Sequence, residues 1–91
     1  MRTDLVRVIW NDAHAVTDAW TPVADLDSDP CVVHSVGHLL PEVKRGHLVL
    51  AQSMIDERAE VDAVLAIPTA MIVRVEVLTA TPLLPVEPLD V

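Results

Sequence analysis

Phenylalanine and tyrosine are absent from this sequence, and tryptophan occurs only as Trp10 and Trp20. The core must therefore be aliphatic, built from valine, leucine, isoleucine, alanine and methionine. Hydrophobic residues make up 52% of the 91 residues, which is enough for one packed domain and too many for a disordered chain. A chain this short buries only a modest core, and apolar surface left exposed usually marks a subunit interface. We therefore expect a homo-oligomer.

Glycine and cysteine are almost as scarce. The two glycines, Gly37 and Gly46, exclude a glycine-rich phosphate-binding loop, and the single Cys31 excludes an internal disulfide framework. An acid stands at Asp4 without a long apolar run beside it, so we expect no signal peptide. No apolar run approaches the roughly 18 residues of a spanning helix, so no membrane partner is expected. These features indicate a cytosolic protein.

Positive charge is in short supply, with six lysines and arginines against 14 acids and a formal net charge of −8. Nucleic-acid binding needs a basic stripe that follows the phosphate backbone, and the sequence has none. Nucleic acid is therefore disfavoured as a partner. A small anionic ligand needs only one or two well-placed cations, for which Arg45, Arg58 and Arg74 are the candidates.

Alternating apolar residues predict five β-strands. We expect them at residues 5–10, 31–40, 47–54, 63–67 and 71–78. The first strand places Val6, Val8 and Trp10 on one face. Gly37 inside the second strand indicates a bulge, a bend or the close approach of another backbone.

The connections between these strands differ greatly in length. Residues 11–30 form a long polar connection with one short helical turn near Asp25, and we expect Trp20 to pin this loop to the domain. Residues 55–62 form a charged hairpin connection or a helical turn, and Pro68 breaks the chain before the last strand. Together these features predict an all-β fold over residues 1–80, a small, strongly bent, five-stranded barrel of the SH3-like or Sm-like kind.

The C-terminal segment, residues 81–91, has no strand or helix pattern. Its prolines recur every third residue, which matches the three-residue turn of polyproline II and would align them on one face. Two interpretations stay open, a frayed tail and an extended arm that docks on another subunit or partner. The apolar side chains favour docking, and the residues of the predicted arm are Pro82, Leu83, Leu84, Pro85, Val86 and Pro88.

The sequence carries no self-sufficient catalytic signature, so we expect a protein that is not an enzyme. Cys31 and His34 would point to opposite faces of one strand, which prevents a Cys–His pair. His34 and His38 would share a face but lie roughly 13 Å apart, too far to hold one ion together. Asp12 and His14 could form a metal site with a histidine from a neighbouring strand only if the tertiary structure happened to bring the three together. We predict no metal and no cofactor.

The candidate residues for binding a ligand or partner are therefore polar, aromatic or cationic side chains outside the expected core. Trp20 is the strongest of them because it lies in the polar loop, where an indole could stack on a nucleobase. The full set is Trp20, Asp12, His14, His34, His38 and Arg74.

Three stretches in this order resemble a group of small bacteriophage proteins. They are residues 8–14 (Val-Ile-Trp-Asn-Asp-Ala-His), residues 31–40 with their Ser-Val-Gly centre, and residues 64–75 with their Ile-Pro turn. The group shows a Trp-x-Asp-Ala-His start, a Ser-Val-Gly-Trp-Leu centre and an Ile-Pro-x-x-x-Ile end. This chain departs from it at His38, where the group tends to have tryptophan. The resemblance implies a phage origin and a small β fold, and no activity.

A phage origin suggests two classes of function. The first is an accessory binding module in the host cytoplasm that acts on a host protein or sequesters a small nucleotide-type ligand. An acidic surface suits this class because it can mimic an anionic partner. The alternative is a structural virion component, such as a minor capsid, decoration or connector protein, that uses the C-terminal arm for subunit contacts.

Overall fold

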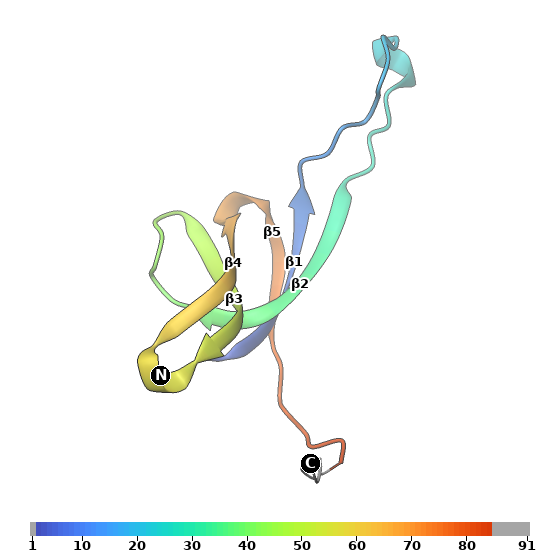
Figure 1. Cartoon of the computed structure of the whole chain (residues 1–91). Helices are drawn as coiled ribbons and strands as arrows, with labels where there is room; N and C mark the ends of the chain where they lie inside the picture. Colours follow the sequence, from blue (N-terminus) through green and yellow to red (C-terminus); the bar gives the residue numbers. More distant parts are fainter. Residues whose placement is uncertain (1, 85–91) are drawn as a thin grey trace, which may run out of the picture.

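The computed structural model describes residues 2–84, and over these residues the chain forms one antiparallel five-stranded sheet without an α-helix (Figure 1). The sheet has the strand order β4-β3-β2-β1-β5. Its strands are β1 (Leu5–Asp12), β2 (Cys31–Leu40), β3 (His47–Ile55), β4 (Glu60–Pro68) and β5 (Ile72–Val77). The predicted all-β class and the number of strands are therefore confirmed.

The core lies on one face of the sheet and is aliphatic, as the composition requires. Val6 and Val8 of β1 are fully buried and pack with Leu50 and Ile67. The residues that flank this cluster are Trp10, Leu39, Leu48 and Ile72. The predicted placement of Val6, Val8 and Trp10 on one face is thus confirmed, while Ile9 on the other face is also buried.

The sheet is not closed into a barrel over the described residues. The ladder partners of β4 all lie on β3, and those of β5 all lie on β1, so β4 and β5 remain the two edges of the sheet. A three-residue 3₁₀ turn, η3 (Thr69–Met71), connects them. The prediction of a barrel is therefore corrected to a strongly bent open sheet, because closure requires a ladder between the first and last strands.

Most strand boundaries differ from the prediction by one to three residues, and the starts of β4 and β5 are the two that change the connections. β4 begins at Glu60 rather than at residue 63, because the hairpin reverses within η2 (Asp56–Arg58) and the left-handed Ala59. β4 therefore includes charged residues that the prediction assigned to the preceding connection. Met71 belongs to η3 and not to β5, since the turn after Pro68 is one residue longer than expected.

Gly37 is a point of close approach between strands, which confirms one of the alternatives predicted for it. A Cβ atom at this position would lie 2.9 Å from the backbone oxygen of Ala51 and 3.2 Å from Cβ of Leu50. Gly37 pairs with the buried Val6 of β1. The absence of a side chain therefore lets β3 fold closely over β2 next to the core.

The described part of the C-terminal segment reaches Leu84. Leu83 and Leu84 are 94% and 66% exposed, so in the described residues they dock on no part of this chain. Pro82 belongs to the same described stretch. The predicted arm residues Pro85, Val86 and Pro88 lie outside the described residues.

We predict that Gly37→Ala lowers the free energy of unfolding by about 1–3 kcal/mol, the usual cost of overpacking a close contact. The added methyl group would meet the Ala51 carbonyl, which belongs to a strand backbone and cannot rotate away. Chemical denaturation followed by circular dichroism measures the change. Ser53→Ala, at an exposed position of β3, is the control and should stay within about 0.5 kcal/mol of the parent chain. Equal stability of both variants would contradict the close approach.

Candidate functional site

The long first connection, residues 13–30, forms an arm that projects from the sheet where β1 ends and β2 begins (Figure 1). Short local hydrogen bonds shape it. The hydroxyls of Thr17 and Thr21 both donate to the carbonyl of Ala19 at 3.0 Å, and the Asp25 amide donates to the Pro22 carbonyl at 2.9 Å. The last of these bonds belongs to η1 (Val23–Asp25), which confirms the predicted helical turn near Asp25.

Trp20 is fully exposed on this arm, with a relative accessibility of 103%. The prediction that it pins the loop to the domain is wrong. The two threonine hydroxyls donate to the Ala19 carbonyl, so these hydrogen bonds next to Trp20 are local to the arm. Three further apolar side chains are exposed along the arm: Val16, Val23 and Leu26.

The arm is also strongly acidic. Residues 11–30 contain five aspartates and no lysine or arginine. The Asp27 carboxylate accepts a 2.9 Å hydrogen bond from the Asp29 amide, a local contact between a side chain and the backbone. Asp18 lines a shallow hollow beside Trp20, together with Leu26. The arm thus presents an indole and aliphatic groups between carboxylates.

A second group of polar side chains lies on the sheet face opposite the core cluster. The strand register places Arg7 of β1 beside Glu76 of β5, and places Ile9 between His34 of β2 and Arg74 of β5. Arg7 Nε donates to Glu76 Oε1 at 2.9 Å, and the Arg74 guanidinium lies 3.6 Å from the same oxygen. Three strands therefore carry this cluster.

The Arg7 guanidinium sets the electrostatics of that cluster. Its hydrogen bond to Glu76 is the main cause that holds the pKa of the carboxyl below its ordinary value of 4.5. Partial desolvation opposes this shift, while the positive charges of Arg7, Arg74 and His34 add to it. Arg74 thus lies beside a carboxylate that offsets its charge, while its side chain stays 63% exposed.

The remaining predicted site residues lie at separate places. His38 shares the face of His34 on β2, as predicted, and its Nδ1 is hydrogen-bonded to the Thr3 hydroxyl at 3.0 Å. Asp12 and His14 lie at the base of the arm, where the His14 ring lies 3.5 Å from the Asp12 carbonyl. Trp20 lies on the arm, so the structure does not gather the six predicted residues into one site.

No three metal-binding side chains among residues 2–84 come together to hold an ion. Cys31 and His34 stand three residues apart in β2, which places their side chains on opposite faces as predicted. A thiolate–imidazole pair between them is therefore not formed.

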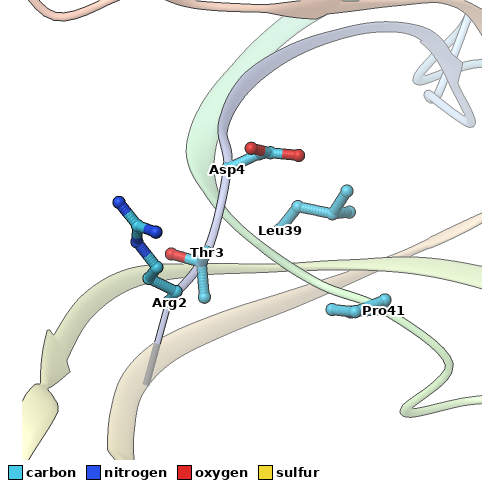
Figure 2. A pocket seen from close by; sticks show the side chains of 5 residues that line it. All are labelled: Arg2, Thr3, Asp4, Leu39 and Pro41. Carbon is cyan, nitrogen blue, oxygen red and sulfur yellow. The ribbon is translucent and has the colours of Figure 1, made fainter.

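One hollow of about 510 Å³ lies where the N-terminal segment crosses β2 (Figure 2). Leu39 and Pro41 form its apolar wall, while the side chains of Arg2 and Asp4 point away from one another on its other side. The hollow is open, and its single cation is accompanied by a carboxylate. It therefore lacks the convergent positive charge that would select a phosphate-bearing ligand.

Sequence reasoning missed Arg7 and Glu76. The alternation of apolar and polar residues places both on the polar face of their predicted strands. The sequence therefore identified each residue as polar and outward-facing, but not the contact between them. Their meeting depends on β5 returning to lie against β1, 69 residues away along the chain. The order of strands in the sheet, which the sequence pattern does not specify, decides that contact.

Comparison with known proteins returned no matching family model, no matching curated protein and no matching solved structure. Among the described residues, no helix has the length and apolar character needed to cross a membrane.

We predict that Arg7→Gln raises the pKa of Glu76 toward 4.5, because the substitution removes its main hydrogen-bond donor and a nearby positive charge. In the parent chain the lowered pKa means that Glu76 adds stability above its ordinary pKa, and that this contribution is lost as the pH falls through the lowered value. Carboxyl chemical shifts in an NMR titration measure the pKa directly. Lys44→Gln, in the β2–β3 turn, is the control, and an equal shift in both variants would contradict a local effect.

Proposed function

We propose that this chain is a non-enzymatic binding module that docks its arm on a partner protein, with Trp20 as the anchor. The partner we infer has an apolar cleft with a basic rim. The full exposure of Trp20 on a projecting, locally folded arm is the observation that carries this proposal. The resemblance to phage proteins supports a host protein as partner and the host cytoplasm as location.

The energetics of tryptophan support an anchoring role. An indole that leaves water buries about 150–250 Å² of surface, worth about 4–6 kcal/mol at 25 cal/mol per Å². In this chain the indole gains none of that energy within the described fold, because it is fully exposed. Tryptophan is also enriched among the few residues that dominate protein interfaces. The neighbouring Val23 and Leu26 would widen the same contact.

The charge of the arm supports a basic partner. Aspartates flank the indole and no lysine or arginine offsets them within residues 11–30. Such a one-signed surface speeds the approach of a positively charged protein and repels nucleic acid. A small nucleotide-type ligand has less support, since Arg74 is paired with Glu76 and the hollow beside Arg2 also carries Asp4.

A structural virion component is the second candidate, and the exposed Leu83 and Leu84 are the observation that favours it. Apolar side chains on an extended segment are typical of arms that lace subunits together. Detection of the chain in purified particles would support this candidate, and its absence from them would exclude it.

The strand order and the 3₁₀ turn between β4 and β5 support a likeness to SH3-like or Sm-like folds, which we keep as part of the proposal.

We predict that a photo-cross-linking aromatic amino acid at Trp20 labels a discrete protein in a bacterial lysate. The same amino acid at Val43, an exposed position of the β2–β3 turn, is the matched control and should not label it. Excess unlabelled parent chain should compete for the labelled protein, while the Trp20→Ala chain should compete at least tenfold less well, since it lacks the anchor. Labelling should weaken as salt rises, because the arm is acidic.

Two results would contradict the proposed docking. Equal labelling from the two positions would show contact without selectivity for the arm. Equal competition by the parent and Trp20→Ala chains would show that the indole is not the anchor. Circular dichroism of each variant confirms that the sheet is retained.

A further inference from the structure

We propose that two copies of this chain pair through their β5 edge strands, antiparallel and centred on Val75, to form a continuous ten-stranded sheet. The occupant of this edge is thus a second copy of the same chain. The inference is independent of the arm and of the partner proposed for it, and it rests on the backbone, the side chains and the surface area of β5.

The backbone of β5 leaves one side free for pairing. β5 is the last strand of the sheet, and over the described residues its only ladder is with β1. The Leu78 amide donates to the Leu5 carbonyl at 2.8 Å, which shows that residue 78 directs its backbone groups toward β1. Because this direction alternates along a strand, Val75 and Val77 direct their amides and carbonyls away from β1. These are the groups that an added strand would meet.

The side chains of β5 are self-complementary in this register. A two-fold axis at Val75 places each Val75 opposite its copy. It also brings Val73, the unpaired residue at the irregularity in the β1–β5 ladder, next to the partner copy's Val77. The three valines are 62%, 41% and 68% exposed at positions 73, 75 and 77. Pairing of β-branched residues directly across two strands is a favourable arrangement in antiparallel sheets. The same pairing also covers an exposed apolar edge, which is otherwise a site of uncontrolled aggregation.

The charges of β5 agree with the same register. The two-fold axis places Arg74 opposite the partner copy's Glu76, and Glu76 opposite the partner copy's Arg74. Within one chain the Arg74 side chain is 63% exposed and its guanidinium lies 3.6 Å from Glu76, which leaves it within reach of a second carboxylate. Each dimer therefore gains two pairs of opposite charge, and Arg7 remains hydrogen-bonded to Glu76 behind them. A shift of the register by one residue would oppose charged and apolar side chains instead.

The exposed area of the chain is consistent with a covered interface. The accessible surface is 7666 Å² for a 9.9 kDa chain. A compact monomer of this mass exposes about 5,200 Å², so the excess is about 2,500 Å². The projecting arm accounts for part of it. A standard protein interface buries about 800 Å² on each partner, which is less than this excess, so the chain exposes enough surface for such an interface.

This dimer would set the geometry of the two arms. A two-fold axis through β5 reverses the direction of β1, and each arm continues from the end of its β1. The two arms would therefore project from opposite ends of the ten-stranded sheet. A dimer would present two Trp20 anchors to separate partners.

The first test is the mass of the full chain in solution, measured by light scattering over a range of concentrations. We expect a dimer. Val75→Pro should give a monomer that keeps the circular dichroism of the parent chain, because proline removes an amide that points away from β1. Val64→Lys, an exposed position on the opposite edge strand β4, is the matched control and should leave the dimer intact.

The second test uses charge reversal and keeps the backbone unchanged. Arg74→Glu and Glu76→Arg should each weaken the homodimer about tenfold, because each variant opposes like charges at two positions. An equimolar mixture of the two variants should restore the dimer, since opposite charges then face one another again. Restoration in the mixture reports this register, and a general loss of folding would not produce it.

Three outcomes would overturn the proposal. A parent chain that stays monomeric at millimolar concentration would exclude pairing through β5. A dimer that survives Val75→Pro and both charge reversals would place the interface elsewhere. Larger closed rings that Val64→Lys disrupts would show that β5 pairs with the β4 edge of the next copy, in a head-to-tail contact.

Discussion

Strand β1 is the element on which the rest of this fold depends, because it pairs with both β2 and the last strand, β5. It pairs with β2 along its whole length on one side and with β5 on the other. Two of its residues, Val6 and Val8, are fully buried and form the centre of the core. The bend that brings β3 and β4 over these valines is possible because Gly37 has no side chain. The small core and the strand order both follow from this arrangement.

That arrangement leaves much of the surface uncovered. A bent open sheet has two edges, and the C-terminal edge strand carries three exposed valines. Exposed apolar side chains also lie on the arm, which extends from the same strand that organises the core, and on β2 and β4. The chain therefore concentrates its stability in a small centre and presents its apolar surface at the periphery. This division is typical of a protein that works through contacts with other proteins, and it is why we infer a binding module.

The polar cluster on the opposite face shows how charge supports the same sheet. Arg7 holds Glu76 across the β1–β5 ladder, and this contact ties the edge strand to the central strand. The cluster is half-exposed, so its contribution to stability is modest. The cluster matters more for geometry, because the Arg7–Glu76 contact fixes the position of the charged side chains of β5 relative to the valines of the same strand. The proposed pairing of two edges depends on that placement.

Local sequence patterns determined the elements of this protein. Alternation of apolar residues identified five strands, since period two places one face of each strand toward the core. Gly37 marked the close approach, and the proline after Ile67 marked the turn before the last strand. Composition required an aliphatic core, which Val6, Val8, Leu50 and Ile67 form.

Tertiary structure decided the features that depend on contacts between distant residues. The edges β4 and β5 stay apart, so the sheet remains open where the pattern of strands predicted a barrel. Trp20 is fully exposed on the projecting arm, whereas residue type alone predicted that it would pack against the domain. Arg7 and Glu76 meet only through the order of strands. Propensity and alternation act over a few residues, whereas strand order and loop direction are set by the free energy of the whole sheet.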